Sequence, residues 1–200
     1  MNKLFYEENL YAQGYAPVGG VDEAGRGPLA GPVVAAAVVF PRGLLIEGVD
    51  DSKKLSPGKR LALSQIIKAN ADAYGIGMAD VETIDRINIL RAAMLAMRRA
   101  AEALAVKPGA LIIDGAFSPE VPGVYHFCLP KADALCHAAA AASILAKVTR
   151  DAIMEALDAE YPQYGFAKHK GYGSAAHREA IQKYGRCPHH RKSFKIKGFD

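Results

Sequence analysis

The eight residues 33–40 contain only valine, alanine and phenylalanine, with no polar side chain among them. A β-strand of this composition has no face suited to water, so both of its faces must be covered by other elements. The segment predicts the interior of a sheet with helices on both sides, which is an α/β fold. The chain has 200 residues and is 50% hydrophobic, which is enough to bury such a core within one domain.

Apolar periodicity and turn signals place the remaining elements. Ser56 followed by Pro57 is typical of an N-cap and a first helical residue, and predicts a helix to about Asn70. The other expected strands are 17–23, 73–81, 110–114 and 123–128, and the other expected helices are 82–105, 134–159 and 174–184. Early strands close in sequence favour antiparallel pairing, whereas the later strand–helix–strand passage favours parallel crossovers, so we expect a mixed sheet.

Charge is unevenly distributed along the chain. The net charge is +4, yet residues 168–200 carry nine Lys and Arg against two acidic residues, while the rest of the chain has a small acidic excess. A basic end on a slightly acidic body suits a polyanionic partner held beside carboxylates, although a merely solvated tail has the same composition. We expect the basic part, from about 160 to 200, to be helical and to belong to a single domain spanning 1–200.

Composition also disfavours several classes of protein. No run reaches the roughly 18 apolar residues of a membrane-spanning helix, and Glu7 and Glu8 stand where a signal peptide would be apolar. Three cysteines without C-x-x-C spacing favour a reducing compartment over a disulfide framework or a zinc site. We therefore expect a cytoplasmic protein that does not contact membranes, and nothing in the sequence requires more than a monomer.

Four acidic residues lie at the edges of the apolar segments. Asp22 and Glu23 follow the first strand, Asp114 ends another strand, and Asp133 begins the alanine-rich helix. A single acid at a strand end is usually a turn residue, but the ends of neighbouring strands lie close together, so these four can converge. Converging carboxylates raise each other's pKa unless a cation neutralises them.

Such a set of oxygen ligands predicts a site for Mg²⁺ or Mn²⁺. Two ions about 3.5–4 Å apart can activate a water and stabilise the leaving oxygen at a phosphodiester. One geometric difficulty follows from the pleat, because adjacent residues of a strand point to opposite faces. Asp22 and Glu23 can share a site only if the strand ends or bulges near Gly25.

The segment from Val21 to Val33, Val-Asp-Glu-Ala-Gly-Arg-Gly-Pro-Leu-Ala-Gly-Pro-Val, resembles the signature of ribonuclease HII, the bacterial type 2 ribonuclease H. Six more blocks match that family in the same order along the chain. They are Asp51–Ser56, Ile87–Leu90, Ile113–Gly115, Ala141–Asp151, His169–Gly173 and His190–Phe194. Together the blocks span about residues 18–194, and seven matches in order are far more specific than any one of them.

This resemblance implies a ribonuclease H-like fold, with a mixed five-stranded sheet flanked by helices and a helical C-terminal region. It implies an endonuclease that hydrolyses the RNA strand of RNA–DNA hybrids and removes ribonucleotides embedded in duplex DNA. Hydrolysis assisted by Mg²⁺ or Mn²⁺ would leave 5′-phosphate and 3′-hydroxyl ends. The catalytic and metal-binding set that it implies is Asp22, Glu23, Asp114 and Asp133.

The resemblance also implies a substrate-binding set. The segment Gly25-Arg26-Gly27 would read the ribose beside the scissile phosphate, since glycine lets backbone amides approach a 2′-hydroxyl closely. Tyr172 would lie against the next sugar and detect an RNA-to-DNA junction. Candidate phosphate contacts are Lys53, Lys54, Ser143, Lys147, Lys170 and Arg191. For each basic residue a plain surface charge is an equally good interpretation, and Ser143 also suits packing within a small-residue helix.

The sequence departs from the family pattern at Ala132, where the family has glycine before the aspartate, and this bears on the placement of Asp133. The related type HIII enzymes carry an additional N-terminal substrate domain. The roughly 17 residues before the first expected strand are too few for such a domain.

Three other functions fit parts of the sequence. Gly25-x-Gly27-x-x-Ala30 satisfies a loose dinucleotide fingerprint, but the next segment is an expected strand where that fingerprint needs a helix. The six histidines suit a metal-free ribonuclease that uses the ribose 2′-oxygen as nucleophile, with His169 as a candidate for a proton step. Most of them lie in the basic tail, where phosphate contact or solvation is expected. A hybrid-binding protein without catalysis would need a damaged carboxylate set, whereas all four acids are present.

Overall fold

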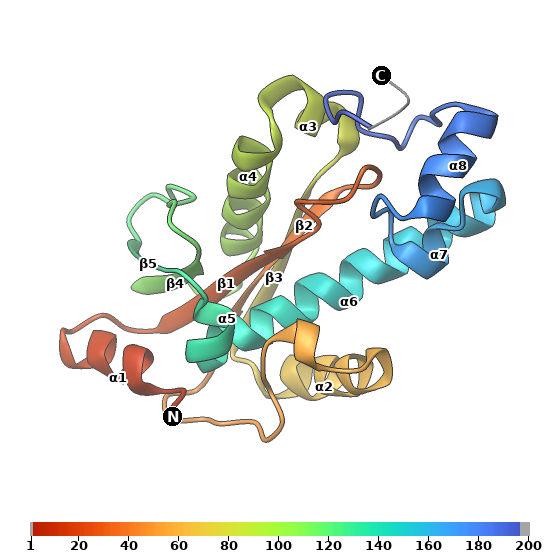
Figure 1. Cartoon of the computed structure of the whole chain (residues 1–200). Coiled ribbons are helices and arrows are strands. Elements are labelled where there is room, and N and C mark those ends of the chain that lie inside the picture. Colours follow the sequence, from red (N-terminus) through yellow and green to blue (C-terminus); the bar gives the residue numbers. More distant parts are fainter. Residues whose placement is uncertain (1, 197–200) are drawn as a thin grey trace.

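In the computed structural model, which describes residues 2–196, five strands form one mixed sheet in the order β3-β2-β1-β4-β5 (Figure 1). The strands are β1 (Val18–Ala24), β2 (Val33–Val39), β3 (Ala73–Ala79), β4 (Ala110–Asp114) and β5 (Tyr125–Leu129). β1 pairs antiparallel with β2 and parallel with β4, and β2 pairs antiparallel with β3. β4 pairs parallel with β5. The expected mixed five-stranded sheet is confirmed.

Helices cover both faces of this sheet. α6 (His137–Glu160) lies along one face with α2 (Pro57–Asn70), and α4 (Ile89–Glu102) lies on the other (Figure 1). β2 contributes to both cores, since Ala36 and Val38 pack on the α6 side and Ala35 and Ala37 pack on the α4 side. This burial on both faces explains why the strand has no polar residue.

The layer between α6 and β1 is built from very small side chains. Residues 138–142 of α6 are all alanine and all buried. A Cβ atom added to Gly20 of β1 would lie 2.2 Å from the backbone nitrogen of Ala139, far inside van der Waals contact. The helix backbone therefore approaches the strand closely, two residues before Asp22.

The helix expected at 82–105 is divided into α3 (Val81–Ile87) and α4. Asn88 lies between them with a φ of 68°, and its side chain accepts a hydrogen bond from the Arg91 N–H to cap α4. The prediction of one helix was wrong because the apolar spacing continues across the break. Asparagine tolerates the left-handed region and is a good N-cap, so its presence at 88 has a physical reason.

The helix expected at 134–159 is also divided, into α5 (Ala132–Leu135) and α6. Cys136 between them is extended, with φ of −126° and ψ of 133°. The sequence did not predict this corner, because Cys136 and the alanines after it are all buried and the apolar composition is the same on both sides. The corner turns α5 toward the ends of β1 and β4.

Most of the remaining helical elements lie near the two ends of the described chain. The sequence did not predict α1 (Phe5–Ala12) or η1 (Ser52–Lys54), whereas α8 (Ala175–Tyr184) was expected. Two short elements, η2 (Pro162–Tyr164) and α7 (Phe166–His169), lie in the C-terminal part that was expected to be helical. The C-terminal part has a small core of its own that includes Met154, Phe166 and Ile181. Among the described residues, no helix is long and apolar enough to cross a membrane.

Candidate active site

Strand alternation brings two aspartates to the same face of the sheet. Asp22 lies two residues beyond Gly20, which faces α6, so the Asp22 side chain points to the α6 side. Asp114 ends β4, two residues beyond Ile112, which packs in that same core. Because β1 and β4 are parallel neighbours, the two carboxylates lie side by side at the ends of adjacent strands.

The third aspartate comes from α5. The chain leaves β5 through Lys131, which has a φ of 66°, and then enters the short helix. The Ala132 N–H donates to Asp114 Oδ1 at 2.7 Å, so the end of β4 caps the start of α5 and fixes Asp133 beside it. Ala132 has an ordinary helical backbone and a buried methyl group, so the departure from glycine at this position leaves Asp133 in place.

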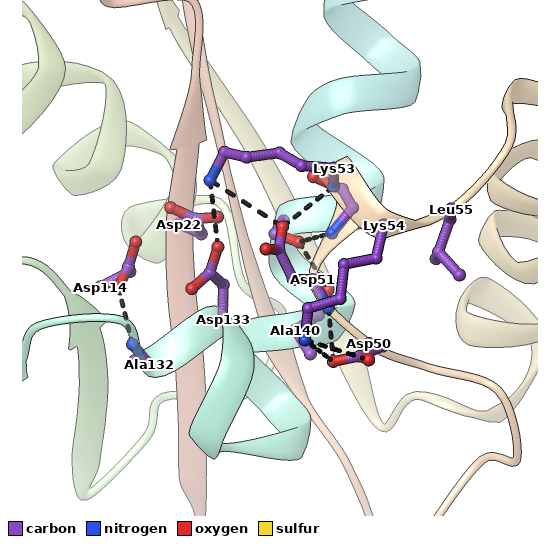
Figure 2. A network of polar contacts seen from close by, with 12 residues as sticks. Asp22, Asp50, Asp51, Lys53, Lys54, Leu55, Asp114, Ala132, Asp133 and Ala140 are labelled. Carbon is purple, nitrogen blue, oxygen red and sulfur yellow. Dashed lines mark hydrogen bonds and ion pairs between the residues drawn. The ribbon is translucent and has the colours of Figure 1, made fainter.

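One carboxylate oxygen from each of Asp22, Asp114 and Asp133 lies within 4.8 Å of the others (Figure 2). Burial raises the pKa of Asp22 well above its ordinary value, and the neighbouring carboxylates raise it further. Burial, and then the charge of Asp133, also raises the pKa of Asp114. A buried group of repelling oxygen donors fits a hard divalent cation, which would neutralise the charge that burial penalises.

Glu23 lies at the edge of this cluster. It continues the regular pairing of β1 with β2, without a bulge, and so turns to the face opposite Asp22. Its carboxylate accepts a hydrogen bond from Arg26 Nη1 at 3.4 Å. Burial raises the pKa of Glu23, the charge of Arg26 opposes this, and the charge of Asp114 adds to it. The structure therefore brings three of the four predicted acids together, and metal binding by Glu23 stays a prediction.

Lys53 reaches the cluster from η1. Its ammonium lies 3.2 Å from Asp133 Oδ2 and 3.9 Å from Asp51 Oδ1, and its side chain is 77% exposed (Figure 2). Burial lowers the pKa of Lys53, but the hydrogen bond and charge of Asp133 outweigh that effect and raise it. An exposed cation beside the carboxylates fits the predicted phosphate contact.

Ser143 does not lie at the surface as a phosphate contact requires. It is buried in α6, where its hydroxyl donates to Ala140 O at 3.0 Å and accepts from the Ser52 N–H at 3.2 Å. The interpretation as a direct substrate contact does not fit this placement. Ser143 holds the segment that carries Lys53.

The segment Gly25-Arg26-Gly27 turns outward directly after β1. Gly25 has a φ of 103°, and a Cβ atom there would lie 2.1 Å from Arg150 Nε. A Cβ on Gly27 would lie 3.6 Å from the Tyr172 ring, which is 49% exposed. The two parts of the chain predicted to read the substrate sugars are therefore neighbours in space.

Two buried arginines support this segment, and the sequence did not predict their structural role. Arg191, predicted as a phosphate contact, is fully buried and donates to the carbonyls of Gly25, Arg26, Gly31 and Pro32. Arg150 is also buried and donates to the carbonyls of Ala30, Pro32 and Lys170. Burial, and then the charge of Arg150, lowers the pKa of Arg191 to about 9. The phosphate-contact interpretation of Arg191 was wrong, because nothing in its local sequence shows that the tail returns to the loop after β1.

The other predicted basic contacts are paired within the protein, and Lys147 and Lys170 are only partly exposed. Lys147 lies 2.7 Å from Asp151, and Lys170 lies 2.6 Å from Glu155. Lys54 pairs with Asp50 at 3.3 Å. Lys147 and Lys170 line a groove of about 610 Å³ between α2, α6 and α7. A phosphate bound there would compete with the carboxylates for these ammonium groups.

Three of the six histidines are buried and not solvated. His137, His177 and His190 are buried, and burial lowers the pKa of each to about 4. His169 uses both ring nitrogens, with Nδ1 accepting from the Gly171 N–H and Nε2 bonded to Tyr164 O. These placements give little support to acid–base catalysis by histidine. The dinucleotide fingerprint is likewise contradicted, because residues 33–39 form a strand.

The sequence profile of the ribonuclease HII family matches residues 19–197 of this chain. The chain belongs to that family. The ribonuclease HII of Geotalea daltonii is 52% identical over 191 residues, covering 96% of this chain and 88% of the relative. The solved ribonuclease H2 from Pyrococcus horikoshii OT3 has a TM-score of 0.75 and 30% identity, covering 89% of this chain and 93% of that one.

A second solved structure, the PCNA:RNase HII complex from Archaeoglobus fulgidus, has a TM-score of 0.69 and 28% identity. It covers 88% of this chain and 92% of that one. Both structural matches cover close to nine tenths of this chain, which confirms the expected ribonuclease H-like architecture.

Proposed function

We propose that this chain cuts the RNA strand of RNA–DNA hybrids and ribonucleotides embedded in duplex DNA, with a divalent metal held by its clustered aspartates. Membership of the ribonuclease HII family makes the chain a ribonuclease H endonuclease. The observation that carries the proposed site is the convergence of Asp22, Asp114 and Asp133 within 4.8 Å.

The three aspartates would hold the metal, and their donor set of carboxylate oxygens favours Mg²⁺ or Mn²⁺. When bound there, the metal supplies activation of a water and neutralises charge on the leaving 3′-oxygen. The protein's own contribution is to fix the ligands in advance. The Ala132 N–H orients the Asp114 carboxylate, and the strand ends and α5 set the separation of the three groups.

The substrate would lie across the exposed side of this cluster. Backbone groups of Gly25-Arg26-Gly27 are proposed to read the 2′-hydroxyl, which distinguishes RNA from DNA. Tyr172, beside Gly27, is proposed to lie against the sugar of the next nucleotide. Lys53, Lys147 and Lys170 would contact phosphates and set the register of the duplex. All of these groups belong to one chain, so a monomer suffices.

The test is cleavage of an end-labelled DNA duplex that contains one ribonucleotide. Wild type and Asp22→Asn are each assayed with Mg²⁺, with Mn²⁺ and with EDTA, and exposed Asp72→Asn serves as a control with the same chemical change. We expect cutting on the 5′ side of the ribonucleotide by wild type and Asp72→Asn with metal. Asp22→Asn should fall by at least about 10³-fold, because it removes a ligand at the reacting centre.

The same assay separates the alternatives. Cleavage that persists in EDTA and leaves a 2′,3′-cyclic phosphate would replace the carboxylate mechanism with a metal-free one. Tight binding of the duplex with no cleavage under any condition would make the chain a hybrid-binding protein.

A further inference from the structure

The segment 169–173, which carries Tyr172, is held by a donor at every carbonyl. The donors are the Tyr172 N–H to His169 O, Arg150 to Lys170 O, the Leu29 N–H to Gly171 O, Ser174 N–H and His177 to Tyr172 O, and Arg178 to Gly173 O. Apart from the Tyr172 and Ser174 N–H groups, which are local, these donors come from α6, from the loop after β1 and from α8. The backbone is therefore fixed from three directions, while the Tyr172 ring is left half exposed.

A chain of hydrogen bonds ends at the Tyr172 carbonyl, and the direction of each bond can be assigned. At its start the Cys187 N–H donates to His190 Nδ1 at 2.9 Å, so the proton of a neutral His190 must be on Nε2. That Nε2 lies 3.0 Å from His177 Nε2, which then accepts. The His177 proton is consequently on Nδ1, and it donates to Tyr172 O at 2.9 Å.

The surroundings favour this neutral arrangement. Both imidazoles are at most 1% exposed, and His169 stacks on His177 with ring centroids 4.4 Å apart. Burial lowers the pKa of His177 and of His190 to about 4, so both rings are uncharged near neutral pH. A backbone donor at one end and a backbone acceptor at the other leave one tautomer for each ring.

The bond from His177 is additional to what the fold of this segment needs. The Ser174 N–H already donates to Tyr172 O at 2.8 Å, so that carbonyl would have a partner without the imidazole. Ser174 Oγ already caps the N–H of His177 at the start of α8. A second donor on a carbonyl that is already satisfied restricts the orientation of the peptide, and with it the direction of the Tyr172 side chain.

We propose that His177 is a positioning residue for substrate discrimination. Through its Nδ1–H bond to the Tyr172 carbonyl, with its tautomer fixed by His190, it holds the Tyr172 ring beside Gly27. The inference rests on the role in junction recognition given to Tyr172 under the proposed function. His177 itself is buried and touches no substrate.

Two substitutions separate the two ends of the imidazole. In His177→Asn the amide nitrogen lies near the position of Nδ1, so the donor to Tyr172 O is kept and the contact with His190 is lost. In His177→Gln the amide reaches the position of Nε2, so the contact with His190 is kept and the donor to Tyr172 O is lost. Both variants lose the ring, so packing defects are matched between them.

The readout is the ratio of two kcat/KM values, one for a DNA duplex with a single ribonucleotide and one for a continuous RNA–DNA hybrid. Both are measured with Mg²⁺ present, at a temperature well below the Tm of the least stable variant. We expect Tyr172→Ala to change this ratio by about tenfold or more, in line with loss of a sugar contact worth over 1 kcal/mol. His177→Gln should change it about three- to tenfold in the same direction, and His177→Asn should stay within about twofold of wild type. Tyr172→Ala/His177→Gln should match Tyr172→Ala alone, because the two residues act on one contact.

Each outcome has a defined meaning. If Tyr172→Ala keeps the wild-type ratio, the proposed role of Tyr172 is wrong and the inference is lost with it. If Tyr172→Ala changes the ratio but His177→Gln does not, the inference alone is overturned. Equal losses by the Asn and Gln variants, in proportion to their lower Tm, would also overturn it by assigning His177 a purely structural role.

A measurement on the wild-type protein covers the case in which a variant does not fold. Two-bond ¹⁵N–¹H spectra of ¹⁵N-histidine-labelled protein at neutral pH, with the signals assigned, should show the Nδ1–H tautomer for His177 and Nε2–H for His190. His126 and His137 should also be Nδ1–H when neutral, because their Nε2 atoms accept from the Val121 and Ile46 N–H groups. An Nε2–H or charged His177 would remove the donor on which the inference depends.

Discussion

Two regions of this molecule bury charge, and they do so in opposite ways. In the acidic cluster, Asp22, Asp114 and Asp133 face one another, burial and neighbouring carboxylates raise the pKa values of Asp22 and Asp114, and the exposed Lys53 ammonium lies beside Asp133. Beneath the loop after β1, Arg150 and Arg191 are buried, and each of their guanidinium nitrogens donates to a backbone carbonyl. The carboxylates still lack sufficient opposite charge, whereas every guanidinium nitrogen of the two arginines already has a hydrogen-bond partner.

The difference explains the division of labour between the two regions. A buried charge without sufficient partners destabilises the fold until a ligand of opposite sign arrives, so it is suited to binding. A buried charge whose hydrogen bonds are all made internally is suited to fixing geometry. The predictions below follow from this contrast, in order of decreasing effect.

Arg191→Met should lower the free energy of unfolding by about 3–5 kcal/mol, because it leaves several buried carbonyls without a donor. The exposed Arg26→Met in the same loop is the control and should cost under about 1 kcal/mol. Urea denaturation monitored by circular dichroism gives both values. A loss of under 1 kcal/mol for Arg191→Met would mean that the arginine does not hold the loop.

His177→Asn should change how stability depends on pH. The folded pKa of about 4 lies below the ordinary 6.5, so the unfolded state binds more protons between these values. Wild-type stability is therefore lost as pH falls through this window, by about 1–2 kcal/mol for this residue between pH 6.5 and 5. The difference in unfolding free energy between the two proteins should narrow by that amount. Parallel pH curves would contradict a neutral His177.

Asp22→Asn should make the metal-free protein more stable at pH 7, by roughly 1 kcal/mol, within the range of single substitutions. Because the folded pKa of Asp22 is raised, the folded state binds more protons than the unfolded state, and the ionised form costs stability as pH rises. The stability gained by Asp22→Asn should therefore shrink as the pH falls. Ionisation of Asp22 makes the wild type less stable at high pH, whereas protonation of His177 makes it less stable at low pH.

Mg²⁺ should raise the Tm of wild type and leave that of Asp22→Asn nearly unchanged, as differential scanning fluorimetry can show. A metal-free Asp22→Asn protein that is less stable than wild type at pH 7 would contradict the account of the acidic cluster.

Glu155→Gln has the smallest expected effect. It releases Lys170 from its 2.6 Å ion pair, and the freed ammonium should tighten binding of a nucleic acid duplex about two- to threefold at low salt. Glu102→Gln, which breaks a similar exposed pair with Arg98 on α4, is the matched control. Fluorescence anisotropy with a catalytically inactive background measures both. An equal gain in affinity from the two substitutions would mean that the effect comes from net charge and not from Lys170.

Local patterns were sufficient to predict much of the fold and the centre of the site. The strand 33–40 and the capped helix after Ser56 are confirmed because their signals lie within a few residues of sequence. Asp22 and Asp114 converge because each ends a strand, which is also a local property. The corners at Asn88 and Cys136 were not predicted, since the apolar spacing runs through both.

The roles of the C-terminal residues depend on contacts between distant parts of the chain. His190 forms a β-bridge with Ala30, and the Arg191 N–H donates to Leu29 O at 2.8 Å. Nothing near residue 191 distinguishes an arginine that binds carbonyls 160 positions away from one that binds phosphate. The same holds for Ser143 and His137, which accept from the N–H groups of Ser52 and Ile46, each 91 positions away.

The alanines of α6 and Gly20 of β1 have a consequence for how this sequence can change. A larger side chain in that layer would push α6 away from the sheet, and α5 would move with it because only Cys136 separates the two helices. Asp133 would then leave Asp22, although no ligand had been altered. Residues that take no part in the chemistry thus fix the spacing on which the reaction depends. A substitution in this part of the core therefore also affects catalytic activity.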